Sequence, residues 1–155
     1  MDALKRLYRD WLSDRGAELI EFAFTFPLLL LVCLGIVDFG LLFQRYEVLT
    51  NAAREGARVA VLPGYDTLPN VQARVNQYLQ GTSLSGVATT TLATETLTPA
   101  LPNGNCVVVK RVVVTYNHNY FFVGGIATWF GSSLGTRTLT GRAAMRQETA
   151  SGACP

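Results

Sequence analysis

Charged side chains are scarce in this chain, and histidine occurs once. Of the 155 residues 15% are charged, and the formal net charge is +2 at pH 7. Lys and Arg are spread along the chain rather than gathered in one stretch, which argues against a nucleic-acid-binding protein. The apolar share of 49% is too high for an intrinsically disordered chain. The length accommodates one small domain plus an anchor rather than two independent cores.

Patterns typical of catalysis or metal binding are also scarce. The only histidine, His118, stands in the stretch Tyr-Asn-His-Asn-Tyr, where we expect a turn and a solvated side chain. No second histidine or carboxylate stands at ligand spacing from it, so we expect no zinc site. The carboxylates beyond residue 38 are too scattered to form an acid–base pair: Glu47, Glu55, Asp66, Glu95 and Glu148. We therefore expect a protein that is not an enzyme and binds no cofactor or small-molecule substrate.

One long uncharged stretch dominates the N-terminal third. Residues 22–37 contain no charged side chain, and residues 39–43 continue the run beyond Asp38. A helix over residues 22–43 is roughly 33 Å long at about 1.5 Å per residue, enough to cross a hydrocarbon core of about 30 Å. A buried helix of a soluble protein fits less well, because four consecutive leucines leave no polar face. An ordinary signal peptide has a shorter apolar region, whereas a plain signal-anchor predicts the same topology.

The segment before this run is polar and slightly positive. Residues 1–16 carry four basic and three acidic side chains. Because a positive flank stays in the cytoplasm, we expect the N-terminus inside and the C-terminal domain outside the bacterial inner membrane. This divides the chain into a cytoplasmic leader (1–16), a transmembrane helix (17–43), an amphipathic extension (44–62) and a small α+β domain (63–155).

A glycine and a carboxylate mark the inner border of the apolar run. The stretch from Gly16 to Glu21 resembles the processing site of type IV prepilins, in which a membrane peptidase cuts after the glycine and a glutamate at the fifth mature position supports assembly. The resemblance implies a cut between Gly16 and Ala17. Glu21 then lies one helical turn from the new amine, which could neutralise it at the membrane edge. The alternative is that Glu21 is an ordinary polar residue at a helix N-terminus.

The wider N-terminal region resembles the TadE-like proteins. The matching features are Glu21-Phe22, Phe26-Pro27, residues 35–40 and residues 51–58, with a weaker match at residues 143–148. The resemblance implies a membrane-anchored minor pilin or pseudopilin of the tight-adherence pilus machinery. Its implied partners are the prepilin peptidase and other pilin subunits.

Helical and strand periodicities predict a pilin-like α+β fold. A single helix over residues 17–62 would present a stripe of mostly small residues to a sheet: Tyr46, Leu49, Ala53, Gly56, Ala57 and Ala60. A short helix that ends at Gly81 should follow Pro69, as indicated by the spacing of Val71, Val75, Tyr78 and Leu79. Strands are expected over residues 87–98, 107–116 and 138–147, with Leu139, Gly141, Ala143 and Met145 sharing one face of the last.

Two further features suggest contacts outside the domain core. Asp38 near the outer end of the membrane run could pair with a partner subunit or reach the headgroups. Residues 120–130 are too short to span a bilayer. They form either a loop folded over the core or an exposed patch that touches lipid or a pilus partner through Phe121, Phe122, Trp129 and Phe130.

The three cysteines have different surroundings in the sequence. Cys33 lies in the membrane run, where we expect a buried small apolar residue. Cys106 opens one strand and Cys154 follows the last. If these strands form an antiparallel pair, the two residues come close enough for a disulfide in an oxidising compartment. Two free thiols are the alternative.

Together these features favour a minor pilin or pseudopilin over two rivals. The first rival is an unprocessed, membrane-anchored binding module, which keeps Met1 as its N-terminus. The second is an anchored enzyme, which would need a pocket with clustered polar side chains.

Overall fold

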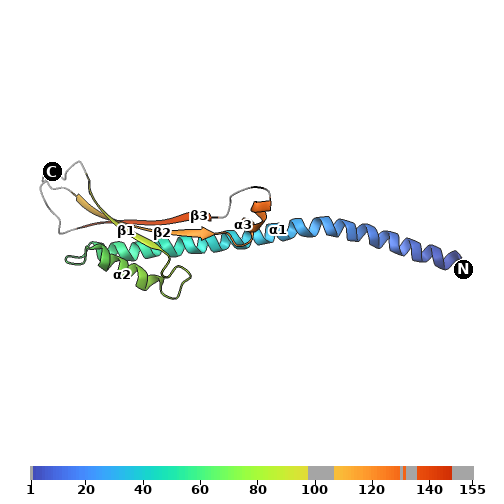
Figure 1. Ribbon diagram of the computed structural model, residues 1–155, viewed down its shortest axis with the longest axis horizontal. Coiled ribbons are helices and arrows are strands. Elements are labelled where there is room, and N and C mark those ends of the chain that lie inside the picture. The colour runs from blue at the N-terminus through green and yellow to red at the C-terminus, as the bar shows by residue number, and fades with distance from the viewer. Residues whose placement is uncertain (1, 98–106, 130, 132–135, 148–155) are drawn as a thin grey trace.

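A computed structural model describes residues 2–97, 107–129, 131 and 136–147 of the chain, with side chains described from residue 16 onward. The elements follow in the order α1 (Asp2–Ala60), α2 (Leu68–Leu79), β1 (Thr89–Leu97), β2 (Val107–Asn119), α3 (Val123–Trp129) and β3 (Thr136–Arg146). The N-terminal half of α1 projects alone, and the sheet lies along its C-terminal half (Figure 1). The predicted α+β architecture, a long apolar helix followed by a small antiparallel sheet, is therefore confirmed.

The long helix is longer than the sequence predicted. It begins at Asp2 instead of residue 17, because the polar leader continues the same helix without a break. Pro27 lies inside it, although proline removes one backbone hydrogen bond. The helix ends at Ala60, two residues before the predicted end, and residues 61–65 form turns.

The core lies between the C-terminal half of α1, the sheet and α2. Leu49, Ala53, Ala57 and Ala60 on α1 are fully buried, as the stripe predicted, whereas Tyr46 is 48% exposed and was wrongly included. Their sheet neighbours in the same apolar cluster are Val112, Val114 and Leu139, and α2 contributes Val71, Val75 and Leu79. Tyr78 of α2 is 39% exposed.

Two glycines allow backbones to approach closely. A Cβ atom added to Gly141 on β3 would lie 2.5 Å from the carbonyl carbon and oxygen of Leu49. One added to Gly56 on α1 would lie 2.8 Å from Cγ2 of Val75. The sheet therefore rests directly on the backbone of α1, which is possible only without a side chain at residue 141.

The sheet is antiparallel with the order β1-β2-β3. Val114 of β2 pairs with Thr90 of β1 and with Gly141 of β3, which places these residues on the helix-facing side. The three predicted strands are confirmed with end shifts of up to three residues. The predicted face of β3 is also confirmed, since Leu139 and Gly141 are buried and Ala143 and Met145 are half-buried.

A lysine is buried at one end of the helix-facing side. Lys110 of β2 is 8% exposed, and its Nζ lies 3.3 Å from Oδ2 of Asp66 and 3.0 Å from Oγ1 of Thr94. A buried ammonium group needs such partners to offset its lost hydration. The next residue, Arg111, faces the opposite side and pairs with Glu95 at 2.7 Å.

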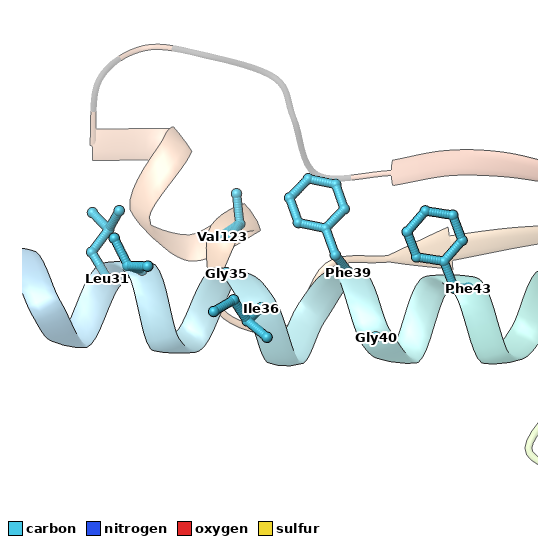
Figure 2. A pocket seen from close by; sticks show the side chains of 8 residues that line it. Leu31, Gly35, Ile36, Phe39, Gly40, Phe43 and Val123 are labelled. Atoms are coloured by element: carbon cyan, nitrogen blue, oxygen red, sulfur yellow. The ribbon is translucent and has the colours of Figure 1, made fainter.

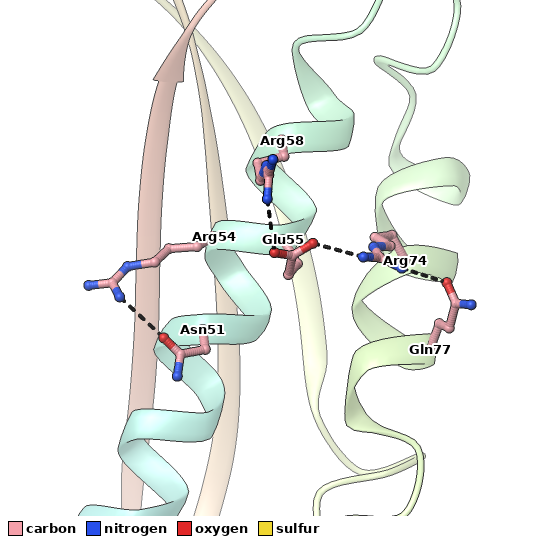
Figure 3. Close-up of polar contacts among 6 residues, drawn as sticks. All are labelled: Asn51, Arg54, Glu55, Arg58, Arg74 and Gln77. Carbon is pink, nitrogen blue, oxygen red and sulfur yellow. Dashed lines mark hydrogen bonds and ion pairs between the residues drawn. The ribbon is translucent and has the colours of Figure 1, made fainter.

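Polar side chains connect α1 to α2 on the outer surface (Figure 3). Glu55 of α1 accepts a hydrogen bond from Arg74 of α2 at 2.9 Å and one from Arg58 at 3.5 Å. The Arg74 hydrogen bond, together with the charge of Arg58, holds the pKa of Glu55 below its ordinary value of 4.5. The folded domain therefore binds fewer protons at this group than the unfolded chain.

Glu55 is expected to make the domain sensitive to acid. A lowered folded-state pKa gives stability that is fully present above the unfolded pKa and is lost as pH falls through the folded pKa. Glu55→Gln should therefore destabilise the domain slightly at neutral pH, and the difference from wild type should vanish well below pH 4.5. Acid unfolding of the full chain in detergent, followed by protease resistance, measures this difference. In an Arg74→Gln background the effect of Glu55→Gln should shrink; an unchanged effect would show that Arg74 is not its cause.

Candidate membrane-border site

The apolar half of α1 has the properties of a single membrane-spanning helix. The stretch Gly16–Ala60 contains a segment long and apolar enough to cross a bilayer, and almost none of that segment is buried within the chain. Its large side chains point outward, with Phe24 80% and Leu28 69% exposed. Such a surface suits lipid rather than water, which indicates a single-pass membrane anchor.

The predicted processing residues lie at the N-terminal end of this anchor. A Cβ atom added to Gly16 would have no heavy atom of the described side chains within 4 Å. Ala17 and Glu21 are exposed on the same helix. The chain is helical through these residues, and the Glu21 side chain is exposed at the N-terminal end of the apolar segment.

Asp38 forms hydrogen bonds within its own chain, which neither of its sequence-based interpretations included. Its side chain is 1% exposed, and its carboxylate accepts hydrogen bonds from the backbone N–H groups of Phe121, Phe122 and Val123 at 3.1, 2.8 and 2.7 Å. Its carboxylate is therefore covered and bonded within the chain. It holds the start of α3 against α1, across more than 80 residues of sequence.

The aromatic segment is a short helix rather than the loop we expected. Residues 123–129 form α3, and Phe121 and Phe122 before it are 79% and 36% exposed. Tyr120 lies with its ring centroid 6.2 Å from that of Phe39 on α1. The side chain of Trp129 and all of Phe130 lie outside the described residues, so only Phe121 and Phe122 of the predicted patch are placed.

His118 is buried in β2, which corrects the expectation of a solvated side chain in a turn. It is 2% exposed, and Nη1 of Arg45 donates a hydrogen bond to its Nδ1 at 2.7 Å. Burial lowers the pKa of His118, and the Arg45 charge adds to this effect while the Asp38 charge opposes it. An Nδ1 atom that accepts from Arg45 requires the neutral ring, with its proton on Nε2.

An open apolar groove follows α1 beside α3 (Figure 2). Its volume is about 630 Å³, and Val123 is its α3 residue. The α1 residues that line it are all uncharged: Leu31, Val32, Gly35, Ile36, Phe39, Gly40 and Phe43. No polar side chain converges on it, so the groove suits an apolar ligand or lipid and offers no acid–base chemistry.

Of the cysteines, only Cys33 lies within the described residues. It is a free thiol exposed on the surface of the membrane helix, not buried within the chain. Cys106 and Cys154 lie outside the described residues. The antiparallel pairing of β2 and β3, on which their predicted disulfide depends, is present.

The structure offers no separate catalytic arrangement among its described residues. In that part of the chain no three His, Cys, Asp or Glu side chains could together hold a metal ion. Residues 131–135 read Gly-Ser-Ser-Leu-Gly, the letters of a nucleophile elbow. That motif joins a strand to a following helix, whereas here it stands between α3 and β3. The order of elements is thus the reverse of what the motif requires.

The fold defines a class: an α+β protein with a candidate single-pass membrane anchor, whose long helix continues under a small sheet. The family model described as TadE-like protein matches residues 16–58, the anchor and most of the amphipathic half of α1. The resemblance to TadE-like proteins is therefore confirmed over that region. No curated protein and no solved structure matches the chain.

Proposed function

We propose that this protein is a minor pilin or pseudopilin that takes part in assembling or anchoring a tight-adherence pilus. It enters the inner membrane with its N-terminus in the cytoplasm and its sheet domain in the periplasm. A prepilin peptidase then removes residues 1–16, and other pilin subunits are its partners.

The extent of the TadE-like match carries this proposal. The match begins at Gly16 and leaves out the polar residues before it, so it starts one residue before Ala17, where the mature subunit would start. It ends at Arg58, close to the end of α1 at Ala60. The matched region is therefore one helix, half of it exposed and apolar and half of it covered by the sheet.

The charge pattern supports the cut and its consequence. Cleavage after Gly16 would create an ammonium group on Ala17, four residues before Glu21 and on the same helix face. A carboxylate at the membrane edge is costly unless it is paired, and an amine of the same or a neighbouring subunit would pair with it. Glu21 is exposed, so a neighbouring subunit can reach it.

Replacing Gly16 is expected to block maturation. A Cβ atom at residue 16 would meet none of the described side chains within 4 Å, so we expect a loss in Gly16→Leu to report on the peptidase rather than on packing. We expect the mature fraction to fall about tenfold or more, since a bulky side chain at a site shaped for glycine is rejected at least this strongly. N-terminal sequencing in wild-type and peptidase-deficient cells measures it, with Ala17 expected as the first residue only in the former. A chain beginning at Met1 in both would favour the unprocessed binding module.

Glu21 separates processing from assembly. Glu21→Gln should leave the cut after Gly16 unchanged but reduce piliation, because the new amine loses its charged partner. Glu18→Gln is the matched control, since Glu18 is an exposed carboxylate on the same helix. Equal piliation in the two variants would contradict the assembly role of Glu21.

A further inference from the structure

The position of α3 along α1 places it at the depth of the membrane. Val123 of α3 lines the same groove as Leu31 and Ile36 of α1. Both α1 residues come well before Arg45, the first charged residue that follows the apolar run. At about 1.5 Å per residue, Asp38 lies about 10 Å and Ile36 about 14 Å inward of Arg45. Half of a hydrocarbon core is about 15 Å thick. If Arg45 marks the headgroups, α3 lies within the outer leaflet.

The composition of this segment agrees with such a depth. Residues 120–136 contain no charged side chain, whereas Arg137 directly follows them. Arg137 pairs in register with His118, which is the hydrogen-bond partner of Arg45. Two arginines from distant parts of the sequence thus stand at one level, which suits the phosphate layer, and residues 120–129, inward of them, are uncharged.

A segment that enters the lipid without spanning it must satisfy its backbone hydrogen-bonding groups. Each unsatisfied N–H group is costly in the hydrocarbon. Here the three N–H groups that precede the first turn of α3 all donate to Asp38. The N–H of Ile126 donates to the carbonyl of Phe122, and the Thr128 hydroxyl donates to the carbonyl of Gly125. The same bonds satisfy the Asp38 carboxylate, which would otherwise be an isolated charge at this depth.

We propose that Phe121, Phe122 and α3 insert into the outer leaflet beside α1, and that Asp38 helps by accepting hydrogen bonds from the N–H groups of Phe121, Phe122 and Val123. The occupant of the groove in Figure 2 is then lipid acyl chain. Continuity with the anchor supports lipid: the groove is lined by residues of the same apolar helix, among them Phe39 and Phe43 at 51% and 65% exposure, and Phe121 before α3 is exposed as well. The insertion fixes the height of the sheet domain above the membrane. It rests on the membrane anchor and not on the pilus role.

The depth of a tryptophan at residue 121 tests the proposal. The full chain, with Trp11 and Trp129 replaced by phenylalanine, would carry Phe121→Trp, Phe24→Trp or Tyr65→Trp. It would be reconstituted at low density in phosphatidylethanolamine–phosphatidylglycerol vesicles with brominated acyl chains. Phe24 is 80% exposed in the anchor, and Tyr65 is 58% exposed beyond the far end of α1. Bromine quenches indole emission at short range, so quenching reports contact with the hydrocarbon.

We expect F121W to lose at least about half of the emission that F24W loses, because both would lie within a core of about 30 Å. Y65W should lose almost none. Quenching of F24W without quenching of F121W would overturn the insertion while leaving the anchor and the pilus role intact. An unquenched F24W would overturn the anchor itself. Shielding of F121W from both bromine and aqueous iodide would assign the surface to a second copy, which also overturns the proposal.

Discussion

Gly141→Ala is expected to destabilise the sheet domain severely, although it adds a single methyl group. The new Cβ would lie 2.5 Å from the carbonyl carbon and oxygen of Leu49 and 2.7 Å from the amide nitrogen of Thr50. These are backbone atoms in the middle of a long helix, so no rotamer change relieves the overlap. Overpacking of this kind costs about 1–3 kcal/mol, and a rigid neighbour places the variant at the upper end or beyond.

Two matched variants show whether backbone contact is the cause. Gly56→Ala also enlarges a buried glycine, but its Cβ would meet the side chains of Val71, Val75 and Val112, at 3.3, 2.8 and 3.2 Å, and these can shift. Ala144→Val adds two methyl groups on the exposed face of β3. We therefore expect the loss of stability to decrease in the order G141A, G56A, A144V.

The measurement must follow the sheet rather than the helix, because an apolar helix stays helical in detergent. Denaturant unfolding of the full chain in micelles, monitored by resistance to a soluble protease, meets this need. If G141A were no less stable than A144V, the close approach of β3 to α1 would be wrong. If G56A were less stable than G141A, contact with rigid backbone atoms would not be what determines the loss of stability.

The sequence predicted the elements of this fold because their signals are local. An uncharged run of membrane length, alanines at helical spacing and alternating apolar residues in a strand each depend on residues close together in the chain. Gly56 and Gly141 stood on the predicted faces, so the close packing of the sheet on α1 followed as well. The ends of the strands were predicted only approximately. β2 continues three residues past its predicted end, to Asn119.

Errors arose where a contact joins distant segments. His118 stands among asparagines and tyrosines, which locally favour a turn, but Arg45 and Tyr120 bury it at the end of β2. The seven residues of α3 include two glycines, so helical propensity alone does not favour a helix there. The backbone bonds to Asp38 stabilise its start, and no pattern within residues 120–130 could indicate an acceptor located 80 residues earlier.

An aromatic residue at the border of a helical stripe was the other source of error. Tyr46 stands at core spacing on α1 but is 48% exposed. A stripe of small residues brings the neighbouring elements so close that a large side chain at its edge does not fit between them. Spacing gives the direction of a side chain, whereas the distance between backbones decides whether it is covered.

Asp38→Ala should release α3 from α1. The substitution removes the acceptor of three backbone N–H groups, those of Phe121, Phe122 and Val123. Hydrogen bonds to a charged group contribute about 1.5–3 kcal/mol, and a buried donor left without an acceptor costs about 1–3 kcal/mol. We therefore expect amide hydrogen exchange at these three residues to accelerate about tenfold to a hundredfold, since each 1.4 kcal/mol is a factor of ten. The core amides of β2 should change little.

Two controls separate the role of Asp38 from a general effect of charge. Asp38→Asn keeps one oxygen that can accept from one or two of the N–H groups, so its exchange rates should fall between those of wild type and D38A. Glu47→Ala removes an exposed carboxylate from the same helix and should leave exchange at residues 121–123 unchanged. Unaltered protection in D38A would show that packing of α3 does not depend on this carboxylate. Loss of protection together with loss of F121W quenching by brominated lipid would show that one side chain holds α3 both on the helix and in the membrane.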